Sequence, residues 1–392
     1  MRCTSVEIRS FRNHSRSQLR ELGSRFNVIS GSNGAGKTSI IEALSVAALT
    51  KSFTDAPDAV LVQTGANTYS IDARFLSDNN VPLNVSVEYA LGPPAKKNIT
   101  VNNDKLRRSS DLVGRIPIVA LTPDDKIITS GSPDERRRFL SIVLSQASRL
   151  YLEDELELRK ALKHRNSLLL DMKQRGASLV SARASLAPWT EVVIERSARI
   201  MARRAAFVEE FRPFLEARYA ELSGGNEHPS LWYCPIGQEE PYVPNAFREM
   251  LERAFERREA EELRRGTTLV GSHRDELMIL IDDKREARRF ASQGQHKTLL
   301  VSMKLAEYHY LRDATGETPI LLLDDVFSEL DANRAARLLE LLSSSEYGQT
   351  FITSTTRESF AGLFAEARAD DAMFIIENGT AESFGGGQAK GK

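Results

Sequence analysis

The sequence predicts an α/β protein in which one domain is interrupted by an inserted helical domain. Strand-like patterns occupy the first part of the chain and return in the last part, whereas the stretch between them is charged and helical in period. We therefore expect the two ends to form one discontinuous domain. The predicted boundaries assign residues 1–133 and 268–392 to the α/β domain and residues 134–267 to a compact helical arm.

The composition allows this division and excludes other classes. A chain of 392 residues with 41% hydrophobic residues can build two or three domains. No run approaches the roughly 18 apolar residues of a transmembrane helix. The formal net charge is −1, so any binding of nucleic acid must depend on local basic patches.

The compartment expected from the sequence is the cytoplasm. The first residues, MRCTSVEIRSFRNHS, lack the continuous apolar segment of a signal peptide. The only two cysteines, Cys3 and Cys234, lie far apart and in no metal-ligand spacing, which is typical of a reducing compartment.

Alternating and apolar runs mark the strands expected in the first part of the chain. The alternation predicts two strands joined by a turn at residues 77–80, and short apolar runs predict two buried strands. Val6 and Ile8 belong to a further alternating segment. The four predicted strands are 26–30, 69–75, 83–89 and 116–121.

The arm is expected to contain helices, and strands are expected again after Gly266. Helical periodicity is clearest in residues 134–175, 189–221 and 244–264, with a break rich in proline and glycine at 223–244. The strands expected after Gly266 are 267–270, 278–281, 319–323 and 349–353. Residues 385–392 are expected to form a disordered tail.

Residues 31–38, GSNGAGKT, match the phosphate-binding pattern G-x-x-x-x-G-K-[ST]. The pattern follows the predicted strand 26–30 and precedes a helical segment, 39–48, which is the context that a P-loop requires. Backbone N–H groups of such a loop face phosphate oxygens, and the helix N-terminus adds positive potential. Here Lys37 is expected to reach the β- and γ-phosphates, and the Thr38 hydroxyl is expected to ligate Mg²⁺.

A P-loop needs an acidic partner at the end of a strand, and Asp324-Asp325 provides one after the apolar run 320–323. One carboxylate can complete the Mg²⁺ shell, and the next can orient or deprotonate the attacking water. Lys37 and Asp324 lie 324 − 37 = 287 residues apart, a separation much larger than in simple kinases and GTPases. The predicted arm lies between them.

The third motif is Ser292-Gln293-Gly294-Gln295, at the start of a helix-compatible run, 299–310. Serine is a favoured N-cap, so an ordinary helix cap is one interpretation of this segment. Together with the P-loop and the acidic strand end, the segment is also expected to form a second anion site at a helix N-terminus.

The three segments GSNGAGKT, SQGQ and LLLDDVFSELD resemble the Walker A, signature and Walker B/D-loop series of ABC-type ATPases. Their combination resembles the RecF family of bacterial recombination mediators, which is related to SMC proteins. Residues 10–14, 131–140 and 270–277 add to the resemblance. It implies an α/β P-loop ABC-type ATPase head, with mixed sheets plus helices, carrying an inserted compact α-helical arm domain.

The resemblance implies a role for each site residue. It assigns ATP to the loop and to the signature, Mg²⁺ to Thr38 and Asp324, catalysis to Asp325 and Lys37, and a position facing a partner subunit to Asp331. The residues expected to bind the cofactor are Gly31, Ser32, Asn33, Gly34, Ala35, Gly36, Lys37, Thr38, Ser39, Arg12, Asn13, Ser292, Gln293, Gly294, Gln295 and Asp331.

The sequence departs from related ATPases in four places, one of them the signature at 292–295, which is SQGQ where transporters have SGGQ. Asp325 stands where a glutamate is usual, and the shorter side chain predicts slow hydrolysis suited to a switch. Residues 353–356, TSTT, replace the switch histidine of transporters, and Thr54 stands where this family is expected to have arginine.

Several basic residues have two interpretations each. Arg12, Asn13 and His14 either approach the nucleotide or form an exposed hairpin turn. His273 and Arg274 either face the active site or form a local turn. Residues 136–138 (RRR) either contact DNA or form a salt-bridged helix start, which is favoured by the preceding acids. Paired arginines at 107–108, 203–204, 257–258, 264–265 and 288–289 either form solvated helix faces or converge into a phosphate-tracking groove.

By resemblance, the expected function is that of an ATP-dependent, DNA-binding recombination mediator. The resemblance implies an ATP-dependent homodimer on double-stranded, gapped DNA, bound largely without regard to sequence and released by slow DNA-stimulated ATP hydrolysis. The implied partners are RecR with RecO, and RecA indirectly, and no membrane. Alternatives are an ABC transporter-type subunit, an SMC-like ATPase subunit and a nuclease-linked relative. The short helices of residues 134–267 contain no sustained heptads, which argues against the SMC-like alternative.

Overall fold

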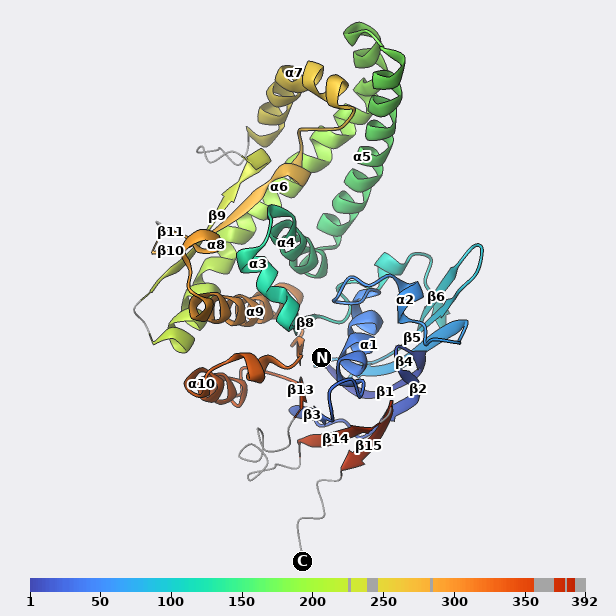
Figure 1. Cartoon of the computed structure of the whole chain (residues 1–392), viewed down its shortest axis with the longest axis vertical. Coiled ribbons are helices and arrows are strands. Elements are labelled where there is room, and N and C mark those ends of the chain that lie inside the picture. The colour runs from blue at the N-terminus through green and yellow to red at the C-terminus, as the bar shows by residue number, and fades with distance from the viewer. Residues whose placement is uncertain (225–226, 238–245, 283–284, 356–369, 378, 385–392) are drawn as a thin grey trace, which may run out of the picture. The chain divides into compact units, whose positions relative to one another are not determined.

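The computed structural model describes residues 1–224, 227–237, 246–282, 285–355, 370–377 and 379–384. The chain divides into two compact units (Figure 1). We call residues 1–126, 221–224 and 300–392 the head unit, and residues 127–220 and 225–299 the arm unit. The domain boundaries given above remain a prediction, and the expected tail, 385–392, lies outside the described residues.

The head unit contains an antiparallel sheet of six strands. Its strand order is β2-β1-β4-β5-β6-β7. The predicted alternation is confirmed, because buried side chains alternate with more exposed ones along both β4 and β5. The strands are β1 (Arg2–Phe11), β2 (His14–Leu19), β4 (Thr68–Leu76), β5 (Pro82–Ala90), β6 (Lys96–Val101) and β7 (Asp104–Lys105).

The second sheet of the head unit is mostly parallel. Its order is β15-β14-β3-β13-β12-β8, and only the pair β14–β15 is antiparallel. Continuous burial along β3, β12 and β13 is typical of a parallel sheet covered on both faces. The strands are β3 (Phe26–Ser30), β8 (Ile118–Leu121), β12 (Ile320–Leu323), β13 (Thr350–Ser354), β14 (Ala372–Glu377) and β15 (Thr380–Phe384).

Helix α1 (Lys37–Leu49) packs between the two sheets of the head unit. Ile40, Ile41 and Leu44 are fully buried, and they share one hydrophobic core with residues of both sheets, such as Val6 and Ile320. Two shorter helices, α2 (Asp58–Leu61) and α10 (Ala332–Leu342), also belong to this unit. Because α1 begins at Lys37, within the P-loop segment, this packing fixes the loop relative to both sheets.

The arm unit contains long helices and one small antiparallel sheet in the order β11-β10-β9. Helix α6 begins in the arm unit and ends in the head unit, as does α9. The strands are β9 (Pro229–Cys234), β10 (Glu276–Ile281) and β11 (Arg285–Glu286). The helices are α3 (Ile127–Ser130), α4 (Pro133–Ala147), α5 (Arg149–Arg175), α6 (Leu179–Ser223), α7 (Phe247–Arg265), α8 (Ala287–Phe290) and α9 (Gln293–Thr315).

The structure differs from the predicted elements in several places. Strands β6, β7, β11, β14 and β15 were not predicted. The helix expected over 134–175 is two helices, separated at Ser148, whose extended backbone and side chain cap α5. The prediction of a strand at 267–270 is wrong. The N–H groups of Thr268 and Leu269 donate to the side chains of Asn166 and Glu262, at 2.7 Å each, instead of to a neighbouring strand. Strand β9 was not predicted, because it lies inside the proline- and glycine-rich break.

Candidate nucleotide-binding site

The P-loop segment connects β3 to α1 in the head unit, as the motif predicts. Gly34 and Gly36 have positive φ angles of 78° and 110°, which favour glycine. A Cβ atom on Gly36 would lie 2.3 Å from Nε2 of His14, so only glycine fits beneath that ring. The turn at these glycines allows successive backbone N–H groups to face one anion.

Lys37 folds back over the loop that precedes it. Its ammonium Nζ donates to the carbonyls of Gly31 and Ser32 at 2.8 and 2.9 Å. Burial lowers the pKa of Lys37, while Asp325 and Asp324 act in the opposite direction. Within the loop itself, Ala35 is buried and its N–H donates to Ser32.

Asp324 ends the buried strand β12 and faces the start of α1. The Thr38 hydroxyl donates to this carboxylate, with both oxygens at 2.9 Å, and Thr353 donates to Oδ1 at 2.7 Å. Burial raises the pKa of the Asp324 carboxyl, and the two hydroxyl donors counteract that effect. A hydroxyl and a carboxylate in contact form the oxygen donor set that Mg²⁺ prefers beside nucleotide phosphates.

Asp325 adopts a left-handed conformation directly after the strand, with φ at 48°. Its N–H donates to the Thr353 hydroxyl at 3.0 Å. Backbone conformations of this kind concentrate at functional sites, where the surrounding contacts maintain them. Thr353 therefore contacts both adjacent acidic residues. No role for this threonine followed from the motifs, although its place at the end of β13, beside β12, was a usable signal.

The turn between β1 and β2 supports the P-loop. Asn13 donates from Nδ2 to the Gly34 carbonyl at 3.0 Å, and Ser39 donates to Asn13 Oδ1 at 3.3 Å. His14 donates from Nε2 to the Gly36 carbonyl at 2.9 Å. The two interpretations of this segment are therefore compatible, since a hairpin turn lies against the loop.

Arg12 binds Glu42 of α1 through two hydrogen bonds of 2.8 and 2.7 Å. The hydroxyls of Ser52 and Thr54 donate to the same Glu42 carboxylate at 2.5 and 3.1 Å. Thr54, at the position where arginine was expected, thus connects its loop to α1. This network fixes the position of Arg12 at the edge of the site.

These residues surround a pocket of about 740 Å³ in the head unit, a volume within the usual range for small-molecule sites. Val60, Val62, Gln63 and Thr64 also line the pocket; they carry no sequence motif and were not predicted. The lining residues are Arg12, Asn13, Asn33, Gly34, Gly36, Lys37, Thr38, Ser39, Val60, Val62, Gln63, Thr64, Asp324, Asp325, Thr353 and Thr355.

The signature segment lies in the arm unit and forms a capping box. Gln295 N–H donates to Ser292 Oγ at 3.3 Å, and Ser292 N–H donates to Gln295 Oε1 at 2.7 Å. Gln295 also donates to Glu227 at 2.6 Å. Ser292 and Gln293 are exposed and Gly294 is half-buried. The interpretation as a helix cap is confirmed, and the cap leaves these groups accessible.

Asp331 caps α10 of the head unit. Its carboxylate accepts the Arg334 N–H at 3.0 Å and contacts the Arg334 guanidinium at 2.8 Å. These contacts lower the pKa of Asp331. The carboxylate remains about half exposed. It is therefore charged and accessible at neutral pH.

Comparison with known proteins decides the family. The family model described as the RecF/RecN/SMC N terminal domain matches residues 2–380. The DNA replication and repair protein RecF of Salinibacter ruber is 39% identical over 377 residues, which cover 96% of this chain and 90% of that protein. RecF of Chloroherpeton thalassium is 40% identical over 366 residues, covering 92% and 96%. The chain belongs to the RecF family.

Solved structures agree with this assignment to the RecF family. The structure described as the recombination mediator protein RecF-ATP in the RecFOR pathway superposes with a TM-score of 0.86 at 29% identity, covering 98% of this chain and 97% of that one. An Smc head domain from Pyrococcus furiosus has a TM-score of 0.54 at 16% identity, which shows a shared fold. The predicted ABC-type head with mixed sheets and an inserted helical arm is thereby confirmed.

Contacts within the arm unit of this RecF-family chain decide between the two interpretations given above for several basic residues. Arg136 binds Glu276 through bonds of 2.8 and 2.9 Å, and Arg137 binds Asp134 at 2.5 Å, which makes this segment the salt-bridged helix start favoured above. His273 and Arg274 contact the Thr268 carbonyl at 3.3 and 3.0 Å, so they form a local turn. Burial lowers the pKa of His273 to about 4, which keeps the ring neutral.

Other arginine pairs are bound by neighbouring acids. Arg258 and Arg265 both contact Glu261, and Arg203 contacts Glu210. These pairs are therefore ordinary charged helix faces, whereas Arg204 is buried. Among the described residues, no helix is both long and apolar enough to cross a membrane.

Proposed function

We propose that this chain binds ATP with Mg²⁺ and acts as an ATP-dependent, DNA-binding recombination mediator. The observation that carries the proposal is the contact of Thr38 with Asp324 at the mouth of the P-loop, supported by Thr353. Two solved RecF-family structures, described as RecF-ATP and RecF-ATPrS, support ATP as the nucleotide.

The residues around the pocket have different roles in the binding and hydrolysis of ATP. Thr38 and Asp324 hold Mg²⁺, which neutralises charge on the phosphates. Lys37 exchanges its contacts with the loop carbonyls for the terminal phosphates, and loop N–H groups bind the remaining oxygens. Asp325 orients the attacking water. Its side chain is one methylene shorter than glutamate, so we expect slow hydrolysis, stimulated when DNA closes the site.

Binding of ATP joins two heads into a homodimer. The exposed Ser292 hydroxyl and the half-buried Gly294 backbone at the start of α9 contact the γ-phosphate held by the other subunit. Asp331 faces that subunit. Capping and phosphate binding use the same chemistry, since both satisfy the donors that a helix start leaves free.

The closed dimer holds double-stranded DNA near a gap, largely without regard to sequence, and hydrolysis releases it. In this role the chain cooperates with RecR and RecO to help RecA load on DNA under repair. The RecF-family relatives, described as DNA replication and repair proteins and as recombination mediators of the RecFOR pathway, support this assignment.

Sedimentation tests the proposal. Wild type is expected to dimerise with ATP and duplex DNA, and Ser292→Arg is expected to bind ATP as a monomer. Ser178→Arg is the matched control. Ser178 is also exposed, and its hydroxyl also accepts a hydrogen bond from the N–H three residues later, that of Ser181, at 3.3 Å. Dimerisation of Ser292→Arg at wild-type ATP concentrations would contradict the assignment. Loss of ATP binding by the Ser292→Arg monomer would place the signature in its own subunit's site.

A further inference from the structure

A second pocket, of about 390 Å³, lies wholly within the arm unit. Strand β10 contributes Glu276 and Met278 to it, and the turn at 272–274 and helix α8 contribute arginines. Several of its lining residues belong to the segments 131–140 and 270–277, which add to the family resemblance described above. Its basic lining residues are Arg137, Arg274, Arg288 and Arg289.

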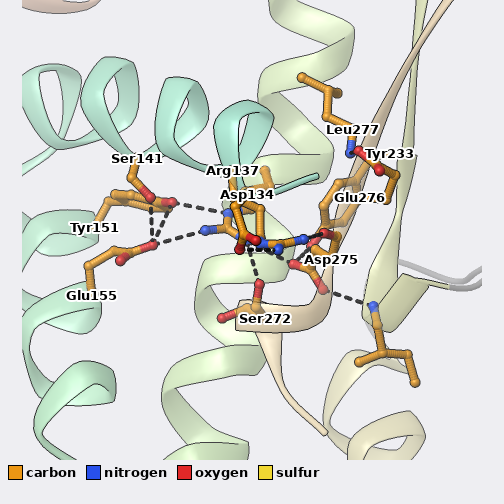
Figure 2. Close-up of polar contacts among 12 residues, drawn as sticks. Asp134, Arg137, Ser141, Tyr151, Glu155, Tyr233, Ser272, Asp275, Glu276 and Leu277 are labelled. Carbon is orange, nitrogen blue, oxygen red and sulfur yellow. Dashed lines mark hydrogen bonds and ion pairs between the residues drawn. The ribbon is translucent and has the colours of Figure 1, made fainter. Parts of the chain in front are cut away.

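The carboxylates of this pocket are neutralised from the protein interior. Asp275 is fully buried and bound by the buried Arg204 at 3.0 Å, within a network that also includes Glu155, Tyr151 and Tyr233 (Figure 2). Arg204 also binds Glu155 at 2.9 Å, and Arg159 contacts Glu155 at 3.5 Å, so the two carboxylates and the two guanidiniums of this network balance. Asp275 therefore does not offset the positive charge of the arginines that line the pocket.

The remaining carboxylates do not balance the arginines either. Glu276 is bound through both oxygens by Arg136, which lies outside the pocket lining. One carboxylate, Glu286, is shared by Arg288 and Arg289, at 3.5 and 2.8 Å. Arg137 is paired with Asp134 at 2.5 Å, whereas Arg274 donates to a neutral partner, the Thr268 carbonyl. The pocket therefore has an excess of positive charge and selects anions.

An exposed tryptophan lies on the same face of the β9–β10 pair as three residues that line the pocket. In the β9–β10 pair, Trp232 is directly opposite Met278, and Cys234 is opposite Glu276. Residues opposite each other, and residues two apart along a strand, share one face of a sheet. Because Cys234, Glu276 and Met278 line the pocket, Trp232 lies on the pocket's face, and it is 48% exposed. Phe290, which ends α8 after the two arginines, is 65% exposed.

We infer that this face binds an unpaired DNA strand, with phosphates on the arginines and a base stacked on Trp232. The inference rests on the proposed function, which brings DNA to the molecule. Arginines beside an exposed aromatic ring are the combination that binds single strands, because every base has a face that can stack. In a duplex the base faces are covered by neighbouring bases, so Trp232 would have nothing to stack on. Stacking of a base at this face was not expected from the sequence, since Trp232 lies more than 40 residues before Arg274 along the chain.

Tryptophan fluorescence provides a direct test. The sequence contains two tryptophans, Trp189 and Trp232, so a Trp189→Phe variant reports on Trp232 alone. Adding oligothymidylate to the full chain with ATP is expected to quench this signal to saturation. Trp232→Ala is expected to weaken binding of the dye-labelled oligonucleotide by about 5- to 150-fold, the range of one stacked base.

The arginines are tested by the salt dependence of binding. The double variant Arg288→Ala/Arg289→Ala is expected to lower the slope of log affinity against log salt by about 1.4, for two phosphate contacts on a single strand. Arg258→Ala is the matched control, since Arg258 is also exposed and ion-paired in the arm unit. It is expected to keep the wild-type slope.

Four outcomes would overturn the inference. If DNA binds with no change in Trp232 fluorescence and with the wild-type slope in the double variant, the inference fails while the proposed function stands. If neither duplex nor oligothymidylate binds, both fail. Equal quenching by a duplex without single-stranded ends would refute the preference for an unpaired strand. Equal quenching by polyglutamate would identify a surface for acidic peptides instead.

Discussion

Replacing Thr353 by valine tests how the site keeps Asp324 charged. Valine has the same shape but loses the 2.7 Å bond to Asp324 and the 3.0 Å bond from the Asp325 N–H. A hydrogen bond to a charged group contributes about 1.5–3 kcal/mol, and one pKa unit corresponds to about 1.4 kcal/mol. Burial already raises the pKa of Asp324, so loss of this donor raises it by about one to two further units.

The sign of the effect on nucleotide binding follows from the proposed role of Asp324. Only the carboxylate form holds Mg²⁺, so Mg²⁺-dependent binding of ATP weakens as the pH falls through the pKa. In Thr353→Val this weakening is expected to begin about one to two pH units higher than in wild type. The assay is the affinity for a fluorescent ATP analogue, measured with and without Mg²⁺ across a pH series.

Two controls separate the hydroxyl from its surroundings. Thr353→Ser keeps the donor and is expected to restore the wild-type profile, and Thr355→Val changes an exposed residue that also lines the pocket. If Thr353→Val and wild type share one pH profile, the hydroxyl does not maintain the charge of Asp324 and the reasoning is refuted.

Three further substitutions probe the site and the arm. Lys37→Met is expected to abolish ATP binding, measured by isothermal titration, with the exposed Lys51→Met as control; normal affinity in Lys37→Met would refute the phosphate assignment. Asp325→Asn is expected to bind ATP, to hydrolyse it far more slowly and to accumulate as a dimer, so a monomer in sedimentation with ATP would contradict its role. Arg204→Met is expected to destabilise the arm by about 3–5 kcal/mol, because Asp275 loses its buried partner; a urea midpoint equal to that of Arg203→Met, its half-exposed neighbour, would refute this.

Sequence reasoning located the parts of the site that depend on local backbone chemistry. The glycines of the P-loop, the acidic end of β12 and the serine at the start of α9 each have a local physical reason to stand where they do. The contact between Thr38 and Asp324 could be expected, because a P-loop requires an acidic strand end. The same reasoning predicted β4 and β5 of the antiparallel sheet and β3, β8, β12 and β13 of the parallel sheet, but not β6, β7, β14 or β15.

Contacts between segments that lie far apart in the chain could not be predicted from the sequence. Thr353 gains its role only because β13 pairs beside β12, and Glu42 holds Arg12 because α1 packs against the antiparallel sheet. Strand β9 is defined by pairing with β10, which lies about 40 residues later. The strand predicted at 267–270 does not form, because the N–H groups of Thr268 and Leu269 donate to side chains from other segments instead of to a neighbouring strand.

The strand order of the parallel sheet has a consequence for synthesis of the chain. The P-loop strand, β3, is among the first segments made, yet both of its neighbours, β13 and β14, come after residue 349. At about 5–20 residues per second, β3 and the apolar helix behind it wait tens of seconds on the ribosome before either partner exists. The arm is complete by residue 299, so it can fold first. The nucleotide site is therefore assembled last, and a nascent chain interrupted before β13 exposes the core side chains of α1 to aggregation.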